Sequence, residues 1–553
     1  MPGTSTDADR RKPPAARTLF DDADELALQV PTSCRRTGRC RECVVEVTAG
    51  ADQLSEPTEA EAFLRPPFRL ACQAEVLDRD AQIAFSVLRR RLRIVPSEPE
   101  PATRRAPIDP VVRLRDGIVH WGTEPIEPVR GGVYGLAVDV GTTTVALELV
   151  DLLDGSTLEA VALENPQRFG GSDVMNRISY DSGPGRGELR YALRKAINHE
   201  LRALYARRGI DRREVYEVVV VGNSTMRDLC FGLDVAPIGE RPYKSTTELD
   251  WLDGRRESTA LLARAHELGL WSHPQARVWG APLVAGHVGA DVTADLVALD
   301  FGKRPNGVEM LVDVGTNTEV VVTGRGRVLA ASCPAGPAFE GGEVTYGMQA
   351  SEGAIESVRL RSAGGFAWHT IGGAEPLGIC GSGLVDLLAE LRRAGRMTAK
   401  GVFPARAREV EVAPEQGISL SRADASALAQ AKAANTVGQR ILLRELGVEP
   451  REVDRLYLAG GFARYIDVAN AIEIGFLAPV PEANVVKVGN SALRGARDLL
   501  VSGSLRGRLA PLLEQVEHVE LETTPDFFEL FVDGCQFKPM PGTERDGGGY
   551  VAA

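Results

Sequence analysis

The sequence predicts a multidomain α/β protein, and three observations lead to this prediction. A chain of 553 residues is too long for one ordinary domain, so two to four are expected. The segment at 139–144, Asp-Val-Gly-Thr-Thr-Thr, returns at 313–318 as Asp-Val-Gly-Thr-Asn-Thr, each time between two apolar runs. Such a repeat indicates an internal duplication into two lobes. Four of the eight cysteines lie near the N-terminus, which indicates a separate small domain there.

Composition and charge narrow the class of protein. Hydrophobic residues make up 44% and charged residues 25%, and no run of 18 apolar residues could form a transmembrane helix. The net charge of −12 and the pI of about 5.4 argue against a nucleic-acid or anionic-membrane partner. The N-terminus has no apolar secretory segment, and eight cysteines in so long a chain do not suggest a disulfide scaffold. We therefore expect a cytoplasmic protein with one metal or cluster site.

The N-terminal region is expected to be a disordered tail at 1–17 and a small domain at 18–90 that begins with a short helix. This domain contains Cys34-x5-Cys40-x2-Cys43 and the lone Cys72. Three thiolates on one loop and a fourth from a distant segment are how plant-type ferredoxins hold a [2Fe–2S] cluster. Gly38 lets backbone amides point at the sulfurs. A structural zinc site, which normally takes two close pairs of ligands, and reduced structural thiols remain alternatives.

The segment at 54–61, Leu-Ser-Glu-Pro-Thr-Glu-Ala-Glu, supports this view. With the cysteine spacing, it resembles the ferredoxin domains that precede the nucleotide-binding part of reductive activators of corrinoid proteins. The resemblance implies a β-grasp fold whose first element is a β-hairpin, whereas here only a charged tail precedes the first helix. We therefore expect either a start codon assigned too late or a truncated sheet without two of its strands, which would shelter the cluster less well.

Residues 91–132 are expected to form a semi-extended linker, because proline occurs at seven positions between 96 and 128. An arginine run at its start is either a solvated face or a docking patch for an acidic partner: Arg89, Arg90, Arg91 and Arg93. A flexible linker would let the cluster domain swing between an electron donor and an acceptor.

Two lobes are expected next, at 133–300 and 301–545, with a tail at 546–553. In the first lobe, strands at 134–140, 143–150 and 157–163 precede a helix at 187–208 and a strand at 218–221. In the second, a long helix at 427–446 precedes strands at 456–458 and 485–488.

The two repeated turns are candidate phosphate-binding loops. Glycine lets the backbone approach an anion, and hydroxyls and amides can bond phosphate oxygens; the candidates are Gly141, Thr142, Thr143, Thr144, Gly315, Thr316 and Asn317. Asp139 and Asp313, at the strand ends, could hold Mg²⁺ through water. One such turn could be an ordinary β-hairpin, but two in matching contexts favour a clamp on a nucleotide.

Other candidate contacts follow strands or open helices. Asn223 either contacts phosphate or a water on Mg²⁺, or only caps a helix. Gly381 and Ser382 open a helix and form a candidate anion site. A glycine pair at a strand-to-helix turn would let adenine and ribose lie against the backbone; it consists of Gly460 and Gly461, followed by Phe462.

Together, the two turns and the segment Leu-Ala-Gly-Gly-Phe at 458–462 resemble the phosphate-1, phosphate-2 and adenosine motifs of the acetate-kinase, sugar-kinase, Hsp70 and actin superfamily. The resemblance spans about residues 133–545. It implies a duplicated ribonuclease-H-like, actin/Hsp70-type, two-lobed ATPase domain that binds ATP and Mg²⁺, with Asp139 and Asp313 as its catalytic residues. It also places Asp291 near the cleft.

The two resemblances imply an ATP-dependent reductive activator of a corrinoid protein. The four clustered cysteines would carry a low-potential electron to Co(II) and regenerate Co(I) for a methyltransferase system. The implied partners are the corrinoid protein, a reduced ferredoxin or flavodoxin as electron donor, and a second copy of the chain. Two alternatives stay open: a small-molecule kinase with an appended redox-sensing ferredoxin domain, and a nucleotide-gated binding protein.

Overall fold

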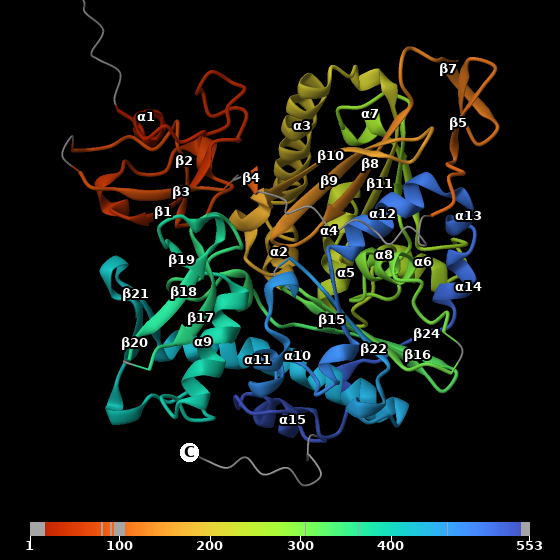
Figure 1. Cartoon of the computed structure of the whole chain (residues 1–553). Helices are drawn as coiled ribbons and strands as arrows, with labels where there is room; N and C mark the ends of the chain where they lie inside the picture. The colour runs from red at the N-terminus through yellow and green to blue at the C-terminus, as the bar shows by residue number, and fades with distance from the viewer. Residues whose placement is uncertain are drawn as a thin grey trace, which may run out of the picture.

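The computed structural model describes residues 17–78, 81–88, 91–92, 106–304, 306–362, 364–461 and 463–542. The expected tails at 1–17 and 546–553 therefore lie outside the described residues except for Arg17, and so do Arg89, Arg90, Arg93 and Phe462. The strands of the described parts form six sheets, and helices pack around them (Figure 1). In these parts, no helix combines the length and the apolar character needed to cross a membrane.

The cysteine-containing domain is built on a small antiparallel sheet. Helix α1 (Leu19–Glu25) begins after Thr18, which forms a capping box with Asp21. The sheet order is β2 (Phe68–Leu70), β1 (Val44–Ala49), β3 (Ala84–Val87). The segment after Thr58 is a single 3₁₀ turn, Glu59–Glu61, and the buried Glu61 holds Arg69 at 2.8 Å. The described part of this domain is thus a three-stranded sheet with one short helix.

The first lobe is organised around a seven-stranded mixed sheet. Its strands β8 (Tyr134–Val140), β9 (Thr144–Asp151) and β10 (Thr157–Glu164) are antiparallel neighbours, and β11 (Val215–Gly222) joins β8 in parallel. The full order is β12 (Leu261–Arg264), β13 (Arg277–Gly280), β11, β8, β9, β10, β4 (Arg91–Leu92). The predicted helix α3 (Glu188–Arg208) shares a core with this sheet. The other helices are α2 (Val174–Asp181), α4 (Ser224–Phe231), α5 (Ala236–Gly239), α6 (Thr246–Leu252), α7 (Ala265–Leu268) and α8 (Ala290–Ala298).

The second lobe repeats this topology, which confirms the predicted duplication. Strands β14 (Glu309–Val314), β15 (Thr318–Gly324) and β16 (Arg327–Cys333) are antiparallel neighbours, and β22 (Arg455–Ala459) joins β14 in parallel, as β11 joins β8. Strands β23 (Val485–Gly489) and β24 (Val516–His518) lie at the two edges. Further elements are the helices α9 (Gly381–Arg393), α10 (Arg422–Leu446), α11 (Val468–Glu473) and α15 (Phe527–Gly534), and the small sheets β18 (Phe366–Thr370)–β17 (Ala354–Leu360)–β19 (Gly378–Ile379) and β20 (Glu409–Ala413)–β21 (Ile418–Ser421).

The expected linker at 91–132 is not extended along its whole length. Residues 112–128 form an antiparallel sheet of three strands, β5 (Val112–Arg115), β6 (Ile118–Trp121) and β7 (Glu124–Pro128). Val112 and Val119 are buried in the first lobe's core, so apolar burial outweighs the proline content. Asp116 and Gly117 both have positive φ, which makes this Asp-Gly pair a tight hairpin turn.

Near its end, the chain returns from the second lobe to the first. Helix α12 (Ser491–Val501), followed by α13 (Gly503–Arg506) and α14 (Leu509–Leu513), packs on β8, β9 and β11, so these residues complete the first lobe rather than the second. Helices α12 and α8 cross so closely that a Cβ on Gly495 would collide with the carbonyl oxygen of Ala294. The small side chains at the crossing therefore let α12 pack tightly on α8 in the core of the first lobe.

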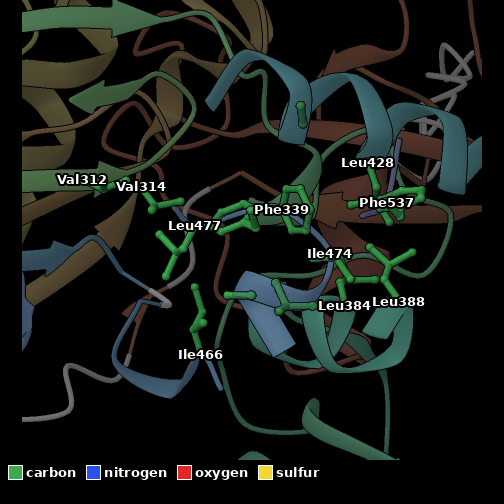
Figure 2. Close-up of a cluster of buried hydrophobic side chains, with 14 of the residues drawn as sticks. Val312, Val314, Phe339, Leu384, Leu388, Leu428, Ile466, Ile474, Leu477 and Phe537 are labelled. Atoms are coloured by element: carbon green, nitrogen blue, oxygen red, sulfur yellow. The ribbon is translucent and has the colours of Figure 1, made fainter. Parts of the chain in front are cut away.

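Phe339 anchors the loop after β16 in the core of the second lobe. Figure 2 shows it in one cluster with Val314 of β14 and with Leu384 and Leu388 of α9. Its ring meets that of Phe476 edge-on, with the centroids 5.0 Å apart. This anchoring restricts the position of the next residue, Glu340.

Gly495→Ala is expected to lower the free energy of unfolding by about 1–3 kcal/mol, because the added methyl group overpacks the crossing of α8 and α12. Urea denaturation followed by circular dichroism measures the change. Gly507→Ala is the matched control: its Cβ would lie 3.6 Å from the nearest atom and its φ is −63°, so stability should stay equal or rise slightly. Equal stabilities of the two variants would contradict the close crossing.

Candidate functional site

The two repeated turns lie face to face where the lobes meet. The first turn, 141–143, joins β8 to β9, and the second, 315–317, joins β14 to β15. The hydroxyl oxygens of Thr143 and Thr316 are 2.8 Å apart, although the residues are separated by 173 positions. Only glycine fits at 141, because a Cβ there would lie 2.6 Å from the Thr144 carbonyl oxygen. The structure thus brings together the two loops that a phosphate clamp requires.

Glu340 bridges the two turns. Its carboxylate accepts a hydrogen bond from the Thr143 hydroxyl at 2.9 Å and another from the Thr316 hydroxyl. Burial raises the pKa of Glu340, while these two hydroxyls and the charge of Arg177 act in the opposite direction. We refer to these three residues as the Thr143–Glu340–Thr316 junction. It holds the two turns together in this state.

Buried carboxylates lie beside the junction. Asp139 is on β8 and Asp313 has the equivalent place on β14, and burial raises the pKa of each to about 7. The charge of Asp291, at the start of α8, adds to both shifts, and burial raises its own pKa to about 6. Burial also raises the pKa of Asp295, one helical turn further on, and that of Glu319 on β15. Ionising all five of these carboxylates together is therefore unfavourable unless a cation is bound beside them.

Two asparagines orient this site. The Asn223 side chain caps α4 by accepting from the Met226 amide at 2.9 Å, and it also donates to the Thr142 hydroxyl at 2.9 Å. Asn223 therefore serves the helix and the first turn at once. Asn490, between β23 and α12, donates to Asp139 at 2.8 Å and ties the end of the second lobe's sheet to the first lobe.

The donor set fits Mg²⁺ and a nucleotide. Both carboxylate oxygens of Asp295 are buried, and neither makes a hydrogen bond of ordinary geometry in the described part of the chain, although Ser491 and the Asp313 carboxyl lie close enough to interact with it. A hydrated cation would supply hydrogen-bond partners, since Mg²⁺ usually keeps several waters. When bound, it would neutralise the carboxylates and favour the binding of phosphate groups beside them. The turns supply hydroxyls and backbone N–H groups for the same oxygens.

The remaining predicted nucleotide contacts lie in different surroundings. Gly460 has a φ of 111° and lies so close to Val314 that a Cβ would collide with the Val314 carbonyl oxygen, which places the glycine pair beside the second turn. A Cβ on Gly461 would meet no atom within 4 Å. Ser382, next to Gly381 at the start of α9, is buried and donates to the Glu356 carbonyl at 2.8 Å rather than to the junction.

The four predicted cysteine ligands converge in the N-terminal domain. The sulfurs of Cys43 and Cys72 are 3.4 Å apart, and the sulfur of Cys34 accepts a hydrogen bond from the backbone amide of Cys40. Two pairs of thiolates match the two irons of a [2Fe–2S] cluster. No group of three or more Asp, Glu, His or Cys side chains in the described residues is arranged to hold a single metal ion.

Hydrogen bonds favour the thiolate form of two of these cysteines. Burial opposes ionisation of Cys34, but donors from Cys40 and Thr37 outweigh it and lower its pKa to about 6. A hydrogen bond from the Cys43 thiol lowers the pKa of Cys72 to about 6, and the same contact raises the pKa of Cys43. The Ser33 amide lies 3.5 Å from the Cys40 sulfur. Donors aimed at sulfur suit the ligands of an anionic cluster.

The cysteine domain is docked on the first lobe. Phe63 meets Phe169 edge-on with the ring centroids 5.7 Å apart, and Phe169 meets Tyr180 in the same way at 5.6 Å. Ion pairs lie around these rings and join the two domains: Arg41 with Glu188, Glu42 with Lys195, and Glu46 with Arg168.

Asn165 connects this docking surface to the first turn. Its side chain donates to the Gly141 carbonyl at 2.8 Å, and its backbone amide donates to the Thr143 carbonyl at 2.7 Å. The 3₁₀ turn Pro166–Gly170 follows immediately and carries Phe169. A short path of bonded and packed residues thus connects the first turn to the docked cysteine domain.

Four residues of the site escape the analysis of the sequence. Glu340 lies in the glycine-rich segment at 335–342, where it is the acidic residue. Asp295 lies four positions after Asp291, on the same face of α8. Asn165 and Asn490 each follow directly after a strand, which is also the position of Asn223. An asparagine directly after a strand is therefore the sequence feature that these three residues of the site share.

Comparison with known families covers most of the chain. Residues 7–77 match the "2Fe-2S iron-sulfur cluster binding domain", residues 134–304 the "RACo middle region", and residues 307–544 the "C-terminal domain of RACo the ASKHA domain". These matches confirm the ferredoxin-like N-terminal domain and the ATPase-type fold of the two lobes.

Individual relatives agree with these matches. The chain is 31% identical to the corrinoid activation enzyme RamQ of Eubacterium limosum over 432 residues, 73% of this chain and 70% of the relative. It is 24% identical to a [Co(II) methylated amine-specific corrinoid protein] reductase of Methanosarcina barkeri, over 72% of this chain and 76% of that one. A solved structure of a reductive activator for corrinoid, iron–sulfur protein superposes with a TM-score of 0.68 at 26% identity, covering 96% of this chain and 98% of the other. The chain belongs to the family of reductive activators of corrinoid proteins.

Proposed function

We propose that this protein uses ATP to drive one low-potential electron through a [2Fe–2S] cluster on its four clustered cysteines to Co(II) of a corrinoid protein, which regenerates Co(I). The observation that carries the proposal is the bonded connection between the two sites. Asn165 contacts the first turn, and Phe169, four residues later, packs against Phe63 of the cysteine domain. The reaction would take place in the cytoplasm, where thiols stay reduced.

The energetic need for ATP follows from redox potentials. A plant-type cluster has a potential near −400 mV. If the Co(II)/Co(I) couple lies roughly 100–200 mV lower, each electron costs about 2–5 kcal/mol. A nucleotide that binds two states of the protein with different affinities can supply a free energy of this size. The clamp must therefore change shape with its ligand.

The junction supplies such a change. The Thr143 and Thr316 hydroxyls already bond each other and Glu340, so phosphate oxygens must replace these contacts. Asp139 and Asp313 would hold Mg²⁺, whose charge would offset that of the phosphates. Replacement of Glu340 by a nucleotide moves the first turn, and Asn165 passes that movement to the docked cysteine domain.

Anaerobic Co(I) formation tests the proposal directly. Reduced, cluster-loaded protein is mixed with a Co(II) corrinoid protein, and the Co(I) absorption band is followed with and without Mg-ATP. Cys43→Ala is expected to abolish the reaction, and Asp313→Asn to weaken Mg-ATP binding about 10- to 100-fold by removing a charged contact. Cys535→Ala, remote from both sites, is the control. ATP consumed only when a small alcohol or acid is present would instead support a kinase.

Mg-ATP affinity is expected to rise between pH 6 and pH 8. Because the pKa values of Asp139 and Asp313 are about 7, both carboxyls are mostly protonated below that pH, and Mg²⁺ must displace the protons. The change is at most about tenfold per pH unit for each proton released. Titration calorimetry at several pH values measures it. Asp154→Asn, at an exposed turn, should keep the wild-type slope, whereas an equally steep slope in Asp313→Asn would argue against this account.

Phe169→Leu is expected to uncouple the two sites. The substitution keeps an apolar side chain but loses the ring contacts with Phe63 and Tyr180, each of which contributes about 0.5–1.5 kcal/mol. ATP binding should stay near the wild-type value while ATP-stimulated Co(I) formation falls about tenfold. Phe231→Leu, elsewhere in the same lobe, is the control. Unchanged stimulation in Phe169→Leu would show that the docking contact does not transmit the signal.

A further inference from the structure

The cysteine site reaches the protein surface at one ligand. Cys34 is half-buried, whereas Cys40, Cys43 and Cys72 are only 6%, 1% and 7% exposed. An electron passes most readily where a redox centre comes closest to the surface. The segment around Cys34 is therefore the natural entry point for electrons.

That segment is strongly basic, although the chain carries a net charge of −12. Between Cys34 and Cys43 lie four arginines and one glutamate. Arg36 is paired with Asp21 at 2.9 Å and also with Asp24, and Arg41 is paired with Glu188. The other two, Arg35 and Arg39, are exposed and have no acidic partner in the described part of the chain. Among the described residues, two positive charges without an acidic partner thus lie one and five positions from Cys34.

Two exposed leucines lie at the end of the helix to which Arg36 ties the cysteine loop. Leu26 and Leu28 follow directly after α1 and are 64% and 38% exposed. Arg36 ties the cysteine loop to α1, since it bonds Asp21 and its guanidinium lies 4.0 Å from the ring centroid of Phe20. We call the set Leu26, Leu28, Cys34, Arg35 and Arg39 the arginine–leucine face. Apolar side chains next to a charged rim are typical of protein-binding surfaces.

The arginine–leucine face takes no part in the docking of the domain on the first lobe. That docking uses Phe63 and ion pairs of Arg41, Glu42 and Glu46. Figure 1 shows α1 on the side of the domain that faces away from β17–β19 of the second lobe. The face is thus separate from the contacts that dock the domain in this structure.

We propose that the arginine–leucine face receives an acidic electron-donor protein. This inference rests on the function proposed above and names the partner that supplies its electron. The donor's reduced one-electron centre is oxidised by one electron and the oxidised [2Fe–2S] cluster is reduced by one, with no bond made or broken. Opposite charges steer the encounter, so association is fast at low ionic strength and slows as salt is added. ATP-controlled transfer to cobalt follows as a separate step.

Stopped-flow reduction of the full-length, cluster-loaded protein tests the proposal. The probe is a purified acidic ferredoxin, chemically reduced and freed of excess reductant, used over a range of ionic strengths. In the double variant Arg35→Glu, Arg39→Glu, the second-order rate constant at low salt is expected to fall about tenfold or more, and its salt dependence to flatten. The charge-matched control is Arg115→Glu, Arg361→Glu, at exposed positions outside the cysteine domain. Photoreduction and the visible spectrum verify that each variant retains its cluster.

The outcomes separate this inference from the proposed function. An unchanged rate in the double variant overturns the docking assignment, and so does a slowing confined to Co(II) reduction, which would assign the face to the corrinoid protein. If the double variant loses its cluster, the test uses the wild-type protein alone. A rate constant for reduction of the wild-type cluster by the ferredoxin that does not depend on ionic strength also overturns the proposal. A wild-type protein that accepts electrons from the ferredoxin but forms no Co(I) with Mg-ATP contradicts only the proposed function.

Discussion

The cost of burying carboxylates where the two lobes meet is the constraint on which the rest of the structure depends. Asp139, Asp291 and Asp313 lie at strand and helix positions that the duplicated sheets bring together, and desolvation moves their pKa values toward neutrality. Protons can balance this charge in the nucleotide-free state, and a hydrated cation can do so when a nucleotide is present. The same carboxylates are therefore compatible with two states of the protein: one in which they are protonated, and one in which a cation and a nucleotide occupy the space between the two turns.

The cysteine domain is held on the first lobe by contacts that are individually weak. Exposed ion pairs such as Arg41–Glu188 contribute about 0–1 kcal/mol each, and the Phe63–Phe169 pair contributes about 0.5–1.5 kcal/mol. A domain swinging freely on an extended linker would need neither. The meander at 112–128 shortens that linker further, because it belongs to the first lobe. The function proposed above thus places electron transfer and the response to nucleotide at one shared interface.

Most of the architecture could be predicted from the sequence because it follows from local signals. The Asp-Val-Gly-Thr repeat gave both turns and both central sheets, and the spacing of the four cysteines gave their grouping. The meander is hard to predict because the seven prolines obscure the Asp116–Gly117 turn and the buried Val112 and Val119 on either side of it. Glu340 and Asn165 escaped for another reason: their roles arise from contacts between segments far apart in the chain, which no local pattern reveals.

The return of α12 to the first lobe has a consequence for the order in which the protein is made. Its residues cover β8, β9 and β11, and the neighbouring Asn490 bonds Asp139, yet they are synthesised after almost the whole second lobe. During translation, one face of the first lobe's sheet therefore stays uncovered until residue 501 has left the ribosome. A fragment ending before α12 would lack part of both lobes, so this protein cannot be divided into independently folding halves at the boundary of its duplication.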